Sequence, residues 1–197
     1  MCGRFYIAGE AYQERSLVLE QVKDFSCPSV KTAGEIFPSD QVPVFIKGPE
    51  HIEIEPMIWG FPRWDGRRLV FNARQESALG KKMFRQSLLD RRAAVLSSGF
   101  FEWTPVPGRS RKDRYLFVLP GEKFLFLAAF WSGFSGSSGG EPQKHFTILT
   151  TEANDSMRSF HSRMPVILAE AEVDDWLSGS FEKYLNRIQA EVQAIKI

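Results

Sequence analysis

The chain has 197 residues, of which 43% are hydrophobic and 13% aromatic, and its formal net charge at pH 7 is +1. This length suits one domain with its own core, and this composition excludes a disordered chain, so we expect a single domain over residues 1–197. Because 25 basic residues balance 24 acidic ones, the net charge neither indicates nor excludes a nucleic-acid partner.

The first ninety residues carry both helical and strand patterns. In chain order we expect a strand over 3–7, a helix over 10–25, a surface loop up to residue 39, strands over 42–46 and 52–58, and a helix over 81–90. The first helix follows from apolar side chains at helical spacing and from Pro28, which ends it. The stretch 59–64 is too rich in glycine, proline and tryptophan for regular structure.

The second half consists mostly of short strands. We expect strands over 93–96 and 100–103, a hairpin of strands 115–119 and 124–130, a mobile loop over 132–140 and a strand over 146–151. A helical turn over 155–160, a strand over 164–168 and a helix over 170–177 follow. Many short strands with few helices predict a β-rich α+β domain.

Charge is unevenly distributed along the chain. Residues 63–92 contain nine basic and three acidic residues. Such a segment can form a phosphate-binding face, although a solvated surface explains it nearly as well. Trp64 lies in this segment, and a tryptophan among arginines on a loop is suited to stacking on unpaired bases, with a place in the core as the alternative.

Cys2 has the most distinctive chemistry in the chain. Loss of Met1 would leave a cysteine that carries both a free α-amine, with an ordinary pKa of about 8, and a thiol, with one of about 8.5. The amine can form a Schiff base with an aldehyde, and the sulfur can close that Schiff base to a five-membered thiazolidine. The alternative is that Cys2 is a small apolar residue at the start of a buried strand.

The two cysteines, Cys2 and Cys27, form neither a disulfide framework nor part of a zinc-binding pattern. The start of the chain lacks a signal-peptide pattern, and no apolar run approaches membrane-spanning length. We therefore expect a cytoplasmic protein without metal or organic cofactor, in which the thiol stays reduced. Nothing in the sequence indicates an interface helix, so we expect a monomer.

Polar side chains in apolar surroundings mark three further stretches. Asn72 can hydrogen-bond a substrate oxygen or the α-amine, and Arg74 can clamp a phosphate, unless Asn72 simply caps a helix. Glu102 lies between aromatic residues, where burial favours the neutral carboxyl and suits it for proton transfer, unless it faces solvent. His161 is one of three histidines and the natural general acid or base, unless its role is structural.

Taken in order, the stretches MCGRF at 1–5, NARQES at 72–77, GFFEW at 99–103 and HSRMPVIL at 161–168 closely resemble the SOS response-associated peptidase (SRAP) family. The resemblance implies a β-rich α+β fold with a curved mixed or antiparallel sheet, short peripheral helices and the processed cysteine in a basic groove. It also implies a function in the DNA damage response. Cys2 would sense abasic sites in single-stranded DNA and form a thiazolidine crosslink that shields them.

The resemblance further implies a role for each motif residue. Cys2 would be the nucleophile, Asn72 would position the amine and the sugar, Glu102 would assist ring opening and proton transfer, and His161 would handle protons in Schiff-base formation and reversal. The enzyme would combine peptidase activity that removes Met1 with lyase-like Schiff-base chemistry. The side chains expected to contact DNA are Arg4, Trp64, Arg74, Lys82, Trp103 and Arg163.

The chain departs from the family pattern in three places. Glu35 stands where members usually have asparagine, and residues 96–98 read LSS where members usually read PAD. The C-terminal family motif has no clear counterpart after residue 184.

Two other functions fit parts of the sequence. A thiol protease would use Cys2 as nucleophile and His161 as base, but it needs an oxyanion hole and a peptide groove that the sequence does not indicate. A non-covalent module for single-stranded DNA would need only the basic segment 63–92. The first would cut unrelated unfolded proteins, and the second would bind intact and abasic strands equally.

Overall fold

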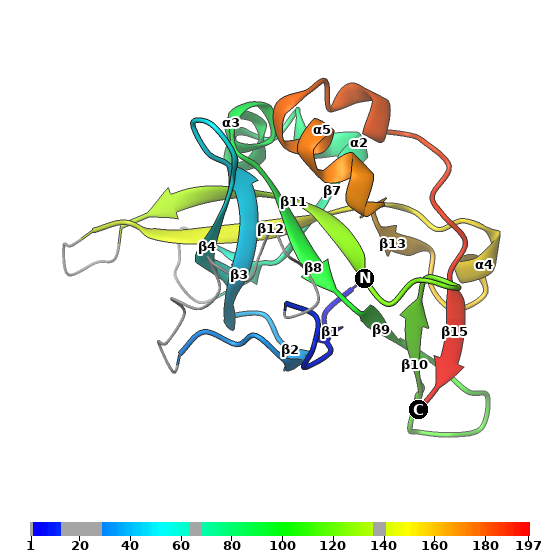
Figure 1. The fold of residues 1–197 in the computed structure, drawn as a ribbon. Helices are drawn as coiled ribbons and strands as arrows, with labels where there is room; N and C mark the ends of the chain where they lie inside the picture. Colours follow the sequence, from blue (N-terminus) through cyan, green and yellow to red (C-terminus); the bar gives the residue numbers. More distant parts are fainter. Residues whose placement is uncertain (1, 13–28, 64–67, 136–140) are drawn as a thin grey trace.

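The computed structural model describes residues 2–12, 29–63, 68–135 and 141–197, which form two β-sheets and a set of short helices (Figure 1). This arrangement confirms the predicted β-rich α+β fold with short peripheral helices. The predicted helix over 10–25 lies largely outside the described residues, and its first three residues form a turn.

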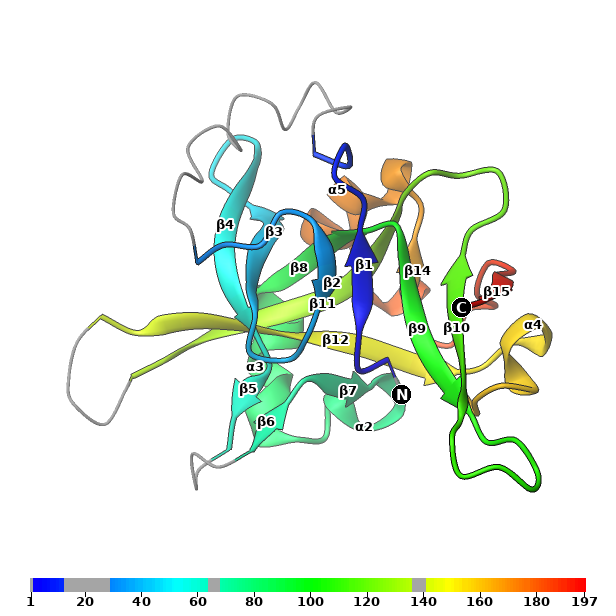
Figure 2. The same ribbon diagram turned by 90° about the horizontal axis from the view of Figure 1, so that it is seen from below.

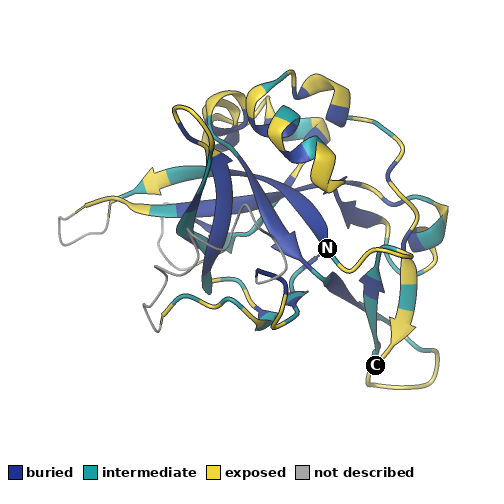
Figure 3. Cartoon of the chain, in the orientation of Figure 1, coloured by how far each residue is buried: buried dark blue, intermediate teal, exposed yellow. Residues whose placement is uncertain are grey.

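Five strands of the larger sheet close into a barrel. Each pairs with two neighbours, in the cyclic order β12, β4, β3, β8, β11 and back to β12, and only β12 and β4 run parallel. Figure 3 shows these strands as largely buried. Their bounds are β3 Gln41–Lys47, β4 Ile52–Trp59, β8 Arg92–Ser97, β11 Leu125–Phe134 and β12 Gln143–Glu152.

Small side chains line the contact between β8 and β11. Ala93 pairs with Ala129 and Ala94 with Ala128, and all four are fully buried. Since successive residues of a strand face opposite sides, alanine at both positions leaves room inside the narrow barrel and also outside it. On the outside, Trp176 of helix α5 fills that room, and its indole Nε1 donates to the Ala93 carbonyl at 2.8 Å.

The second sheet is antiparallel, with the strand order β15, β10, β9, β1, β2. It lies below the barrel in Figure 1 and faces the viewer in Figure 2. Strands β2 and β15 were not expected from the sequence. The bounds are β1 Phe5–Ile7, β2 Gly34–Ile36, β9 Gly99–Thr104, β10 Asp113–Val118 and β15 Gln193–Lys196.

The predicted hairpin of strands 115–119 and 124–130 is wrong. Strand β10 pairs with β9 and β15 in the second sheet, whereas β11 pairs with β8, β12 and β14 around the barrel. The turn at Gly121, whose φ is +78°, carries the chain from one sheet to the other. Local turn residues mark a change of direction but do not decide which strands pair, and here both strands pair with distant ones.

The bend at Gly99 joins the two sheets, because β8 leaves the barrel there and continues as β9. Gly99 has a φ of +157°, and a Cβ atom at this position would lie 2.7 Å from the Phe117 carbonyl oxygen. The Ser97 hydroxyl secures the bend by donating to the carbonyls of Tyr6 and Gly99. Only glycine fits this junction without displacing β10.

Short elements complete the fold. The predicted helices over 81–90, 155–160 and 170–177 are confirmed, whereas the predicted strand over 164–168 is split, with one part on β12 and the other on β11. Of the predicted loop over 132–140, residues 132–134 belong to β11 and residues 136–140 lie outside the described residues, and residues 59–64 contain a short strand. These elements are α2 Gln75–Ala78, α3 Lys82–Asp90, α4 Asp155–Arg158, η1 Glu170–Glu172, α5 Val173–Ser178, η2 Glu182–Tyr184, β5 Phe61–Pro62, β6 Leu69–Val70, β7 Asn72–Arg74, β13 Arg163–Pro165 and β14 Ile167–Leu168.

Candidate functional site

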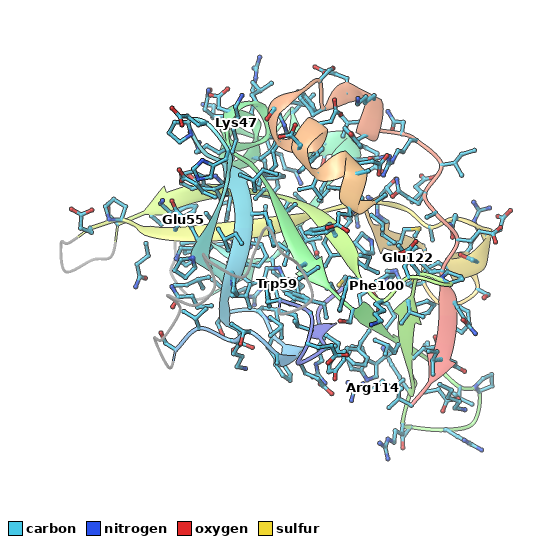
Figure 4. The ribbon with its side chains drawn as sticks, in the orientation of Figure 1. Lys47, Glu55, Trp59, Phe100, Arg114 and Glu122 are labelled. Atoms are coloured by element: carbon cyan, nitrogen blue, oxygen red, sulfur yellow. The ribbon has the colours of Figure 1, made fainter. Side chains whose placement is uncertain are left out.

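Cys2 lies three residues before β1, and the side chain of Asn72, on β7, contacts its backbone. Cys2 is 1% exposed and belongs to the hydrophobic core. Phe5, three residues later, packs on Trp59 of the barrel with ring centroids 5.0 Å apart. Figure 4 places Trp59 and Phe100 near the middle of the molecule. The core therefore anchors the N-terminal segment between the two sheets.

The Cys2 thiol is neutral in this environment. Burial and, to a smaller extent, the negative charge of Glu102 raise its pKa from the ordinary 9.0 to about 12. Its Sγ lies 3.6 Å from the Arg4 carbonyl oxygen, to which it donates a weak hydrogen bond. An ordinary thiol pKa of about 8.5 would make some thiolate accessible near neutral pH, whereas here the sulfur can react only if its proton is removed during the reaction.

Asn72 holds the Cys2 backbone. Its Nδ2 donates to the Cys2 carbonyl oxygen at 2.7 Å. Asn72 is the first residue of β7, and helix α2 begins only at Gln75, so the alternative in which Asn72 caps a helix is wrong. Within the described part of the chain, the Asn72 Oδ1 is buried and makes no hydrogen bond. Oδ1 can therefore accept a hydrogen bond from a donor group placed beside it near the N-terminus.

Glu102 lies on β9 and is 5% exposed, so the alternative of a solvent-facing side chain is also wrong. Its negative charge contributes to the raised pKa of the Cys2 thiol, and the Phe101 backbone N–H donates to the Arg4 carbonyl oxygen at 2.9 Å, so the segment that begins at Cys2 runs beside β9. The sequence alone did not decide which way this side chain faces. The structure brings Cys2, Asn72 and Glu102 together from three separate segments.

His161 lies just before β13 and is fixed by its neighbours. The Arg163 backbone N–H donates to His161 Nδ1 at 2.9 Å, and the Arg163 carbonyl oxygen lies 3.2 Å from the same nitrogen. The preceding Phe160 packs on Tyr115, at 4.8 Å between centroids, and Tyr115 pairs with Glu102 across β10 and β9. Phe160, which precedes His161 in the chain, thus packs on the strand that pairs with the strand of Glu102.

Arg163 is buried and forms a bidentate ion pair. Its guanidinium donates to the Glu76 carboxylate at 2.7 and 3.0 Å and to the Thr150 carbonyl oxygen at 2.8 Å. Burial tends to raise the pKa of Glu76, but hydrogen bonds from Arg163 and from the backbone, together with the charges of Arg163 and Arg74, hold that pKa below its ordinary value. The Arg163 guanidinium is thus engaged with Glu76 and Thr150 in this structure, whereas we had expected it to contact DNA.

The other expected DNA contacts lie at the surface or outside the described residues. Arg74 and Lys82 are exposed, at the end of β7 and the start of α3, and Trp103 is half-buried on β9. Trp64 lies outside the described residues. Arg74 lies two residues after Asn72 on the same strand, β7.

Sequence analysis missed a group of charges next to Trp103. The Glu35 carboxylate accepts hydrogen bonds from Arg4 at 3.0 Å and from Arg114 at 2.5 Å. Glu35 drew attention only as a departure from a family pattern. Nothing distinguished Arg114 from the other basic residues of the stretch 109–114, which reads RSRKDR. Strand pairing brings them together, because β1 lies between β2 and β9, and β10 follows β9.

The described residues contain no group of three or more histidine, cysteine, aspartate or glutamate side chains that could hold a metal ion. In the same part of the chain, no helix is long and apolar enough to cross a membrane.

Known proteins resemble this chain over nearly its whole length. The family described as SOS response associated peptidase (SRAP) matches residues 1–196. The abasic site processing protein YedK of Escherichia coli is 26% identical over 180 residues, which cover 90% of this chain and 79% of YedK. The abasic site processing protein YoaM of Bacillus subtilis is 27% identical over 189 residues, covering 90% of this chain and 79% of YoaM. A crystal structure of a protein from Bacteroides thetaiotaomicron has the same fold, with a TM-score of 0.80 at 22% identity, covering 100% of this chain and 92% of that one. This chain therefore belongs to the SOS response associated peptidase (SRAP) family.

Proposed function

We propose that this protein captures abasic sites in single-stranded DNA as a covalent thiazolidine at Cys2, once Met1 has been removed. The observation that carries the proposal is the arrangement at the N-terminus. Asn72 holds the Cys2 carbonyl, and the negative charge of Glu102 contributes to the raised pKa of the Cys2 thiol. Relatives named as abasic site processing proteins support the choice of substrate.

The order of bond formation follows from the neutral thiol. The Cys2 α-amine, with an ordinary pKa near 8, is the stronger nucleophile at neutral pH and adds first to the C1′ aldehyde of the opened sugar. Loss of water gives the Schiff base. The sulfur then bonds to the same carbon, while its proton passes through Glu102 to the nitrogen, which becomes the amine of the ring. One water leaves overall, and no oxidant or metal is required.

The remaining site residues fit the other proton transfers. The His161 imidazole can donate a proton to the sugar oxygen during ring opening or to the departing hydroxyl. The buried Asn72 Oδ1 can accept a hydrogen bond from the α-amine that removal of Met1 creates. The peptidase activity in the family description would then correspond to that removal, and lyase-like Schiff-base chemistry to the capture itself.

Closure of the ring explains why capture would protect the strand. A Schiff base at an abasic site permits β-elimination, which cuts the DNA. A thiazolidine contains no imine, so elimination stops. Arg4, Arg74 and Lys82 would hold phosphates and Trp103 a base, and an unpaired strand reaches such a site without the cost of opening a duplex.

The neutral thiol also weighs against a thiol protease. Such an enzyme needs a thiolate, and a pKa of about 12 leaves very little of it at pH 7.

Intact-mass spectrometry tests the proposed function. The purified protein is incubated with a single-stranded oligonucleotide that bears one abasic site, and an intact strand serves as control. We expect loss of Met1 and then a mass gain equal to the oligonucleotide minus one water, with the abasic strand only. A Cys2→Ala variant that has also lost Met1 should give no stable adduct. An equally stable adduct with that variant would exclude the thiazolidine.

A further inference from the structure

Two arginines converge on one carboxylate beside the candidate site. Arg4 Nη1 and Arg114 Nη2 donate to different oxygens of Glu35, at 3.0 and 2.5 Å. The three side chains are 26%, 25% and 34% exposed, in the order Arg4, Arg114 and Glu35. Figure 4 places Arg114 at the lower edge of the molecule, on the second sheet. An anion from solution can therefore reach both arginines.

The two guanidinium groups make cation–π contacts with aromatic rings. Arg4 lies over Phe37 at 4.1 Å and over Trp103 at 4.9 Å from the ring centroids. Arg114 lies over Phe101 at 3.9 Å and over Trp103 at 5.6 Å. Trp103 thus contacts both cations, and the alternating rings and guanidinium groups extend across β2, β1, β9 and β10.

This geometry is that of an anion site already filled by the protein. Two guanidinium groups that aim at one point are the usual way of binding a phosphate, and Arg4 is among the residues expected to contact DNA. Glu35 occupies that point. Hydrogen bonds from Arg114 and Arg4 hold the pKa of Glu35 below its ordinary value, with burial opposing, so the carboxylate stays charged at neutral pH.

We propose that Glu35 is a built-in competitor for DNA phosphates at Arg4 and Arg114 and thereby determines specificity for damaged strands. This inference rests on the proposed function. Glu35 lowers the affinity for any single strand, because a phosphate must displace it. An intact strand then dissociates readily, whereas an abasic strand is retained by the covalent bond at Cys2.

The test measures non-covalent binding of an intact oligothymidylate, which has no aldehyde, by fluorescence anisotropy over a range of salt concentrations. Glu35→Gln keeps the size of the side chain and removes its charge. We expect it to bind at least about fivefold more tightly than wild type at low salt, with a salt dependence of log K steeper by about 0.7 for each phosphate gained. Affinity equal to or weaker than that of wild type would overturn the proposal.

Glu172→Gln is the matched control. Glu172 forms a bidentate pair with Arg187, with the same side-chain exposures of 34% and 25%, in η1 beside α5 on the far side of the barrel from β2 (Figure 1). Its substitution removes the same charge and should leave binding of the oligothymidylate within about twofold of wild type. An equal gain in both variants would mean that only net charge matters and would overturn the proposal.

Arg114→Gln gives a second readout. In the wild-type background its effect should be small, because Glu35 already neutralises Arg114. In the Glu35→Gln background it should reverse most of the gain. Equal effects in both backgrounds would contradict the competition. The proposed function is tested separately by the adduct with an abasic strand, so a wild-type protein that forms no adduct would refute capture and leave the binding result for Glu35 intact.

Discussion

At the scale of single residues, the reactive group and the hydrophobic core coincide. Cys2 is packed as a core residue, and its thiol is kept neutral by burial and by Glu102. The same carboxylate that disfavours a free thiolate can accept the proton when sulfur attacks. This combination suits a thiol that should close a ring on a preformed Schiff base and should not react with other electrophiles.

Glu102→Gln should separate the two steps of capture. The amide cannot accept the thiol proton, so ring closure should slow by about 100-fold, the usual contribution of a general base, while the Schiff base still forms. We expect little stable adduct on a denaturing gel, restoration of the adduct when borohydride reduces the Schiff base, and more strand cleavage. Glu55→Gln, on β4 away from the N-terminus (Figure 4), should behave as wild type. Undiminished stable adduct in Glu102→Gln would refute the relay.

Residue types and motif order allowed Cys2, Asn72, Glu102 and His161 to be predicted as site residues, and the structure brings the first three together. Their orientations could not be predicted, because a single strand pattern does not say which face is buried. Glu35 and Arg114 were missed for a related reason. They lie 79 residues apart in the chain. They meet because the strand order of the sheet places only two strands between β2, with Glu35, and β10, with Arg114.

At the scale of elements, apolar periodicity predicted the positions of individual helices and strands but not their pairing. Helices α3 and α5 and strands β3, β4, β8 and β9 carry clear apolar patterns and form where expected. The hairpin of β10 and β11 failed because pairing depends on distant partners. Strand β15 was missed because three of its four residues are exposed, so it carries no apolar pattern. Among the described strands it lies at the edge of the second sheet, next to β10.

The junction between the two sheets depends on Gly99. In Gly99→Ala, the new Cβ would lie 2.7 Å from the Phe117 carbonyl oxygen at a φ of +157°. Both the clash and the backbone strain should lower the free energy of unfolding by about 2 to 3 kcal/mol. Urea denaturation measures this change. Gly9→Ala, where no atom lies within 4 Å of the new Cβ, should change it by less than about 0.5 kcal/mol. Equal stabilities of the two variants would contradict this account of the bend.

Arg92 joins the ends of two helices. Its guanidinium donates to carbonyls at the end of α5, including Trp176 at 2.6 Å and Gly179 at 2.9 Å, and to Leu89 near the end of α3 at 2.6 Å. Arg92→Met keeps the aliphatic stem and removes these bonds, so we expect a loss of about 3 kcal/mol in the free energy of unfolding. Urea denaturation should show little change for Arg85→Met, on the exposed face of α3. A loss below about 1 kcal/mol in Arg92→Met would mean that packing alone holds α5.

At the scale of the whole molecule, closure of the barrel depends on contacts that no local pattern reveals. Strand β12 pairs in parallel with the end of β4, joining residues 145–146 to 58–59, and also with β7, which carries Asn72. Curvature of the sheet was expected, but the ring of five strands was not. This pairing fixes Asn72 to the barrel, while Cys2 enters from the second sheet, so the site forms only when both sheets are in place.

Stability at alkaline pH should therefore depend on Cys2. Its pKa rises from the ordinary 9.0 to about 12 on folding, chiefly through burial. Above pH 9 the unfolded chain loses this proton and the folded protein keeps it, so the free energy of unfolding falls as pH increases towards 12. Burial also raises the pKa of Tyr12, which acts in the same direction. Between pH 8 and pH 10 the contribution of Cys2 should amount to about 1 kcal/mol.

Urea denaturation at the two pH values measures this contribution when wild type is compared with Cys2→Ala, after mass spectrometry has established the first residue of each. Alanine does not titrate, so the variant should lose about 1 kcal/mol less than wild type between pH 8 and pH 10, whatever its stability at pH 8. Tyr12→Phe should have a reduced loss too, but only at higher pH, since the ordinary pKa of tyrosine is 10.0. Equal losses in wild type and Cys2→Ala would mean that the thiol reaches solvent in the folded protein, and the order of steps in which the amine attacks first would lose its physical basis.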